Sequence, residues 1–134
     1  MKFLAILIIV LLHGIQSKAD TLDYWHVNYN NKEIKRFNLN DRTRVISLKL
    51  KAIKPTDEIT IAYFRDTPCA QCLTSIFFND KTNTFIGVAN GTGTRSPISL
   101  ILESILKTHQ TSFTFYYHEV GQNTNVYLFT LELK

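Results

Sequence analysis

Residues 112–133, "SFTFYYHEVGQNTNVYLFTLEL", hold two segments in which every second residue is apolar, separated by a polar turn. The apolar positions are Phe113, Phe115 and Tyr117 in the first segment and Tyr127, Phe129, Leu131 and Leu133 in the second. Such alternation is typical of a strand with one buried face, and the intervening "GQNTN" is rich in turn-forming residues. The stretch therefore predicts an antiparallel hairpin whose aromatic face lies in the core.

A second alternating stretch is "RVISLKLKAI", residues 44–53. Its apolar positions are Ile46, Leu48, Leu50 and Ala52, and the positions between them are Ser47, Lys49 and Lys51. One solvent-exposed face is common in antiparallel sheets, whereas strands of parallel sheets are normally covered on both faces. The pattern predicts a strand that runs to about residue 52 in an antiparallel sheet.

Most of the remaining sequence also reads as strands and turns. In residues 24–39, Asn30-Asn31 tolerates the positive φ angles of a tight hairpin turn. "EITIAYF", residues 58–64, is apolar on both faces, which favours a central strand. Residues 73–78 and 84–90 are two further strands around the turn residues "NDKTN".

One segment breaks this period. In "SPISLILESILKTHQ", residues 96–110, apolar residues recur at helical spacing, Ser96 suits a helix N-cap and Pro97 suits the first helical position. We predict a short helix from about Leu100 to Lys107, although "PISLIL" equally fits a strand. The expected fold is mostly β: a single-domain antiparallel β-sandwich, or a small barrel, of about 7–8 strands with one short helix near 98–108.

The first 19 residues have the pattern of a secretory signal peptide. Lys2 supplies a positive charge, Phe3 to Leu12 form an apolar run, and Ser17 and Ala19 are small residues before an expected cut after Ala19. The run is shorter than the about 20 residues needed to cross a bilayer. We therefore expect an exported protein, secreted or periplasmic, without a membrane span.

Removal of residues 1–19 would leave 20–134 as a chain of ordinary size for a single domain with one core. Two of the 15 basic residues and none of the 11 acidic ones lie in the removed segment, so the net charge would be +2. That balance is too weak to indicate a nucleic-acid or membrane partner. Basic residues do gather between 32 and 54, where they would suit an anionic partner or simply discourage edge-to-edge strand pairing.

The only two cysteines, Cys69 and Cys72, lie in "RDTPCAQC", directly after the expected central strand. In an oxidising compartment the pair is expected to form a disulfide. A loop this short removes little unfolded-chain entropy, equivalent to roughly 2 kcal/mol. The bond is therefore expected to make one exposed loop rigid rather than to hold the whole fold together.

Two other roles for the cysteines remain open. A strand followed by C-x-x-C is also the layout of a thiol–disulfide oxidoreductase, with Cys69 as nucleophile and Cys72 as resolving thiol. Such a site needs a helix start to stabilise the thiolate, whereas "LTSIFF" favours a strand. A metal site would need two further ligands, and His26, His109 and His118 have no familiar ligand spacing. We expect no metal and no cofactor.

No other residues form a recognisable catalytic pattern, since there is no G-x-S-x-G elbow and no suggestive pair of carboxylates. The leading hypothesis is therefore a non-enzymatic binding module, with an unknown protein or glycan as its ligand. Its contact residues are expected in two loops, namely Arg65, Asp66, Thr67, Asn90, Thr92 and Arg95. Asn90-Gly91-Thr92 also matches the acceptor pattern for N-glycosylation. The sequence does not give the oligomeric state.

Overall fold

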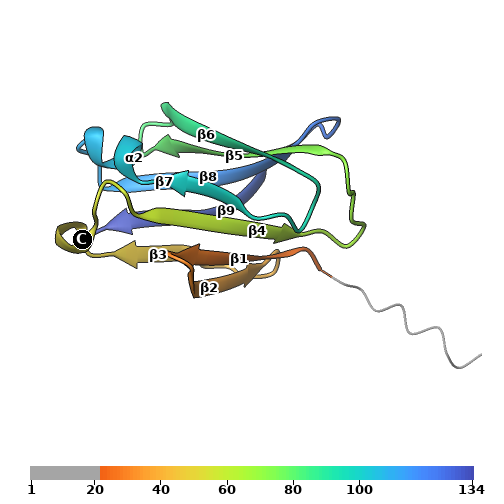
Figure 1. Ribbon diagram of the computed structural model, residues 1–134, viewed down its shortest axis with the longest axis horizontal. Coiled ribbons are helices and arrows are strands. Elements are labelled where there is room, and N and C mark those ends of the chain that lie inside the picture. Colours follow the sequence, from red (N-terminus) through yellow and green to blue (C-terminus); the bar gives the residue numbers. More distant parts are fainter. Residues whose placement is uncertain (1–21) are drawn as a thin grey trace, which may run out of the picture.

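Nine strands in two facing sheets make up the fold in the computed structural model, which describes residues 22–134 (Figure 1). The expected signal peptide, residues 1–19, lies outside the described residues. Within them the strands form two separate sheets and not one closed sheet, so the sandwich form of the predicted fold is the one observed. In residues 22–134, no helix is long and apolar enough to cross a membrane.

The four-stranded sheet has the order β2-β1-β4-β7, and every neighbouring pair is antiparallel. Its strands are β1 (Tyr24–Tyr29), β2 (Lys32–Asn38), β4 (Glu58–Phe64) and β7 (Ile98–Ile101). The hairpin turn at Asn30 and Asn31 is confirmed, with φ angles of 47° and 66°. β4 lies between β1 and β7, which confirms it as an interior strand.

The five-stranded sheet has the order β3-β9-β8-β5-β6. Its strands are β3 (Val45–Leu48), β5 (Leu73–Asp80), β6 (Phe85–Thr92), β8 (Ser112–Glu119) and β9 (Val126–Leu133). β8 and β9 form the predicted C-terminal hairpin, and β5 and β6 form another around the turn of residues 81–84. The predicted hairpin of residues 112–133 thus supplies two interior strands of this sheet.

β3 differs from its prediction in length and direction. It pairs with β9 in parallel, with Val45 opposite Thr130 and Leu48 opposite Leu133, whereas the other pairs are antiparallel. Beyond Leu48 the chain turns into the 3-10 helix η1 (Leu50–Ala52), and Leu50 is exposed rather than buried. The strand ends where β9 ends, since the backbone of Leu50 then bonds to Lys134.

The prediction for Tyr127 was also wrong, because β9 contains an irregularity. Phe115 lies opposite Phe129, but the next residue, Tyr116, lies opposite Tyr127, so Leu128 is an extra residue on β9. Leu128 and Phe129 are both fully buried. Tyr127 therefore shares the outer face with Tyr116 instead of the inner face with Phe129.

The predicted helix exists but is shorter, namely α2 (Glu103–Lys107). Ser96 is not its N-cap and Pro97 is not its first residue, because Ile98–Ile101 forms β7. The strand buries Ile98 and Leu100 on alternate positions and pairs with β4. Residues 98–101 form a strand rather than a helix because pairing with the edge of β4 supplies backbone hydrogen bonds and buries their apolar side chains.

The core lies between the two sheets and combines aromatic with aliphatic side chains. Trp25 of β1 is fully buried, as are Phe113 and Phe115 of β8. The ring of Phe115 stacks on those of Phe129 and Phe78, with centroids 4.8 and 5.0 Å apart. Burial of each such side chain stabilises the fold by about 1.5–3 kcal/mol, so the packing of the inner faces of both sheets against each other holds the sandwich together.

Candidate functional site

Two loops meet at one end of the sandwich, and we call this end of the molecule the loop end. The loops are residues 65–72, between β4 and β5, and residues 93–97, between β6 and β7. The predicted disulfide between Cys69 and Cys72 is present. The N–H groups of Gly93 and Thr94 donate to the carbonyls of Cys72 and Cys69, at 2.7 and 2.8 Å. In return, the N–H of Cys69 donates to Thr94 Oγ1 at 2.9 Å. Residues 65–72, which we call the disulfide loop, are thus fixed to the second loop by hydrogen bonds at both cysteines.

Gly93 makes this close approach of the two loops possible. Its φ is +80°, a conformation that residues with a side chain rarely adopt. A Cβ atom at this position would lie 2.6 Å from the carbonyl oxygen of Ala70. Glycine is therefore required here both for the backbone conformation and for the contact.

The environment of the cysteines differs from that of a redox site. β5 begins at Leu73, directly after Cys72, so the expected strand and not a helix follows the cysteines. The positive end of a helix is what lowers the thiol pKa in C-x-x-C enzymes. Within residues 22–134, no group of three or more His, Cys, Asp or Glu side chains is arranged to hold a metal ion.

The residues predicted to bind a ligand take up different positions. Thr67, Asn90, Thr92 and Arg95 are exposed, and so is Asp66, whose N–H donates to Asp23 Oδ1 at 2.9 Å. The two loops that carry Thr67 and Arg95 are brought together, since the N–H of Arg95 also donates to the carbonyl of Tyr63. Asn90 and Thr92 belong to β6 and not to a loop.

Arg65 points inward instead. Its Nη1 donates to Glu119 Oε1 at 2.6 Å, and the Glu119 side chain is only 5% exposed. The ion pair joins the end of β4 in one sheet to the end of β8 in the other. Arg65 therefore serves the junction between the sheets.

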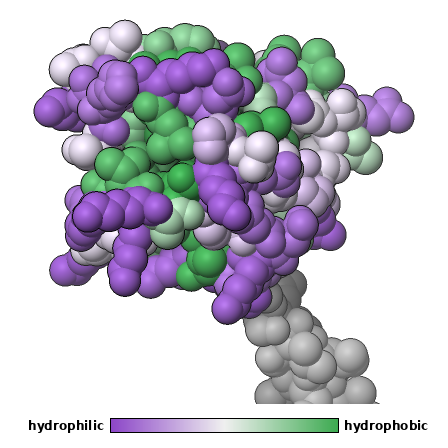
Figure 2. All heavy atoms as spheres, turned by 60° about the vertical axis from the view of Figure 1, so that its left-hand side comes forward, coloured by the Kyte–Doolittle hydropathy of each residue, from purple (hydrophilic) through white to green (hydrophobic). Residues whose placement is uncertain are grey.

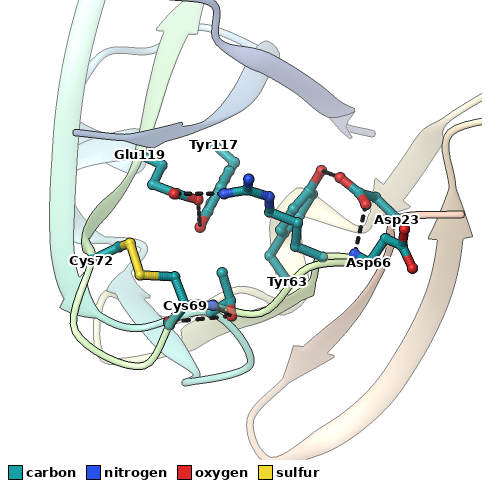
Figure 3. Close-up of polar contacts among 9 residues, drawn as sticks. Asp23, Tyr63, Asp66, Cys69, Cys72, Tyr117 and Glu119 are labelled. Carbon is teal, nitrogen blue, oxygen red and sulfur yellow. Dashed lines mark hydrogen bonds and ion pairs between the residues drawn. A yellow bond between two sulfur atoms is a disulfide. The ribbon is translucent and has the colours of Figure 1, made fainter. Parts of the chain in front are cut away.

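Further polar residues surround this ion pair, and we call the group the bridging cluster: Asp23, Tyr63, Arg65, Tyr117 and Glu119. The hydroxyl of Tyr63 donates to Asp23 at 2.6 Å, and that of Tyr117 points to Glu119 at 3.4 Å (Figure 3). The cluster lines a small cavity of about 130 Å³, to which Gln122, Thr124 and Val126 also contribute.

Burial controls the ionisation of the cluster. It raises the pKa of Tyr63, and the hydrogen bond to Asp23 raises it further. Burial likewise raises the pKa of Tyr117, and the charge of Glu119 adds to the effect. The pKa of Arg65 is raised by its hydrogen bond to Glu119. At neutral pH both phenols are therefore neutral donors. The side-chain oxygens of Asp23 and Glu119 already accept from residues of the cluster.

Apart from Arg65, sequence reasoning missed this cluster, although one signal was available. Glu119 follows Phe113, Phe115 and Tyr117 at the same two-residue spacing, so the alternation places a charged residue on the buried face. A buried charge requires a partner. Asp23 precedes β1 and has no such pattern.

An apolar hollow of about 350 Å³ lies beside the disulfide loop. It is lined by Leu73, Thr74, Ser75, Asn90, Gly91 and Val120. Leu73 and Val120 are 61% and 62% exposed, and the N–H of Val120 donates to the carbonyl of Leu73 at 2.9 Å. Two neighbouring aliphatic side chains at the surface make this the apolar part of the loop end.

Comparison with protein family models, with curated proteins and with solved structures finds no significant match to this chain. The chemistry of the loop end is therefore the basis for a functional proposal.

Proposed function

We propose that this chain is an exported, non-enzymatic binding module whose contact surface is the loop end. The surface comprises the exposed part of the disulfide loop together with Asn90, Thr92 and Arg95. The apolar hollow lined by Leu73 and Val120 adjoins this surface, since Asn90 also lines it.

One observation carries the proposal: hydrogen bonds tie the two loops to each other, and the disulfide closes one of them. Loops ordered in advance lose little conformational entropy on binding, which favours affinity. The sandwich beneath them is a rigid support for such loops. Strand β5 after Cys72, in place of a helix, disfavours the oxidoreductase alternative.

The ligand proposed is a protein rather than a glycan. The hollow is lined by aliphatic and small side chains, and none of its lining residues is aromatic. Sugars usually bind to protein through stacking on aromatic rings, whereas exposed aliphatic residues beside polar ones are typical of protein contact surfaces.

The test uses the full chain, immobilised and exposed to extracellular fluid of its host, with bound proteins quantified by mass spectrometry. Leu73→Asp should reduce retention of a partner at least tenfold. Leu50→Asp is the matched control, because Leu50 is also exposed but lies away from the loop end. Its N–H donates to the carbonyl of Lys134, next to the start of β8, whereas the loop end lies beside the end of β8. Equal retention by both variants, or no retained protein, would refute the proposal. Binding to a glycan array that depends on Leu73 would replace the protein ligand with a glycan.

A further inference from the structure

The described part of the chain has four edge strands, two in each sheet: β2 and β7, and β3 and β6. An edge strand presents unpaired N–H and C=O groups, to which a strand of another molecule can bind. Proteins usually prevent this with charged side chains or with very short edge strands. The four edges can therefore be compared by these two criteria.

Three of the edges are protected. β2, "KEIKRFN", carries Lys32, Glu33, Lys35 and Arg36 in seven residues. β3 and β7 have only four residues each. The basic cluster noted in the sequence thus lies partly on an edge strand, where it discourages pairing.

β6 meets neither criterion. It is eight residues long, "FIGVANGT", and contains no charged residue. Phe85 and Val88 are 60% and 50% exposed. Among the described residues, β5 is its only hydrogen-bonded strand neighbour, and β7 of the other sheet lies close to it where Gly91 faces Ile98. Figure 1 shows β6 outermost on its side of the sandwich. Although α2 lies near β6, it leaves both of these side chains exposed.

An apolar row on the outer face of the sheet ends at this edge. Val88 lies opposite Phe77, Phe77 opposite Tyr116, and Tyr116 opposite Tyr127. The rings of Phe77 and Tyr116 stack on each other at 5.1 Å, so their faces are turned to each other and not outward to a sugar. A strand added to β6 would extend this row beyond Val88.

We propose that β6 pairs with β6 of a second copy of this chain, antiparallel and about a two-fold axis, which joins two five-stranded sheets into one of ten strands. A two-fold axis places each strand against an identical one, so any charge near the axis would meet a like charge. β6 is the long edge that has none. Asn90 and Thr92, at the end of β6, belong both to this interface and to the binding surface proposed at the loop end, whereas Phe85 and Val88 belong to this interface alone.

Sedimentation equilibrium of the full chain, with the N-terminus of the purified form established by mass spectrometry, tests the proposal. The wild-type chain should form dimers. Val88→Lys should weaken dimerisation at least tenfold, because two lysines then meet near the axis. Thr114→Lys is the matched control, since it places the same charge on the outer face of the interior strand β8 and should leave dimerisation within twofold of the wild type.

A second variant and a second readout guard against loss of folding. If Val88→Lys loses its near-ultraviolet circular dichroism, Phe85→Lys replaces it, because Phe85 is still more exposed. Amide hydrogen exchange of residues 85–92 should slow as the protein concentration rises. A wild-type chain that stays monomeric, including one that pairs only with an added extended peptide, would overturn the proposal, as would equal weakening by Val88→Lys and Thr114→Lys.

Discussion

The rings of Tyr63 and Tyr117 stack face to face with centroids 4.2 Å apart, although the two residues belong to different sheets. The neighbouring Arg65–Glu119 ion pair joins the same two strands. Stacking and ion pairing thus close the sandwich directly beneath the loop end. The proposed binding surface and the stability of the fold are coupled through this junction.

Arg65→Ala should lower the free energy of unfolding by about 3 kcal/mol, because Glu119 would remain as an unpaired buried charge. Addition of Glu119→Gln should restore part of the loss, since the buried charge is then removed. Urea denaturation at pH 7 measures both. Arg36→Ala is the control, because its pair with Glu33 is exposed and contributes less than about 1 kcal/mol. Strictly additive effects of the Arg65 and Glu119 changes would contradict this account.

Gly93→Ala should destabilise the fold by about 2–4 kcal/mol, because it combines an unfavourable φ with a clash against the Ala70 carbonyl. Gly121→Ala is the matched control: its φ is +94°, but no atom lies within 4 Å of the added Cβ. It should cost only about 1 kcal/mol. Thermal and urea denaturation compare the two, and equal losses would mean that the contact between the loops is unimportant.

Replacement of both cysteines by serine should lower the free energy of unfolding by roughly 2 kcal/mol or less and leave the sandwich folded. The larger effect should be local. The amides of Gly93 and Thr94, which bond to the disulfide loop, should exchange with solvent faster, while amides of β8 are unchanged. Complete unfolding, or unchanged exchange at these two amides, would show that the disulfide does not act on the loops.

The raised pKa of Tyr63 and Tyr117 predicts a loss of stability in alkali. Below about pH 10 both phenols are neutral in the folded and unfolded states, and their contribution is fully present. Above that pH the unfolded chain ionises first, so stability falls as pH rises towards the folded values. Tyr63→Phe should make the fall between pH 9 and 11 less steep in urea denaturation. An unchanged slope would contradict the raised pKa.

The lowered pKa of Asp57 predicts a loss of stability in acid. It is 8% exposed, and hydrogen bonds from the Lys54 backbone, the Tyr29 hydroxyl and the Asn30 amide lower its pKa below 3.8. The stability that these bonds confer is present above about pH 4 and is lost as pH falls through the lowered value. Asp57→Asn should destabilise the protein at pH 7 and should weaken the pH dependence below pH 4. Acid titrations of both proteins by circular dichroism check this.

The strands could be predicted because their alternation is local. The buried faces of β4 and β8 and the turn at Asn30-Asn31 follow from residues that are neighbours in sequence. The errors arise from how the strands pair, which alternation within one strand does not determine. Leu50 alternates correctly but lies beyond the end of β9, and Tyr127 is turned outward by the extra residue Leu128.

The candidate site was predictable only in part. The disulfide and its exposed loop follow from two cysteines three residues apart. The contacts of Arg65 could not be predicted, because its partner Glu119 is 54 positions away and in the other sheet. Charge and spacing identify a candidate for binding but not the direction in which its side chain points.

The parallel pairing of β3 with β9 has a consequence for how the chain folds. Val45 meets Thr130, so this ladder closes a loop of more than eighty residues. Loop closure of that length is slow, and folding dominated by such distant pairings takes milliseconds to seconds. We expect β3 to be the last strand to join. During synthesis it must wait, without a neighbour, until residues 126–133 have emerged from the ribosome.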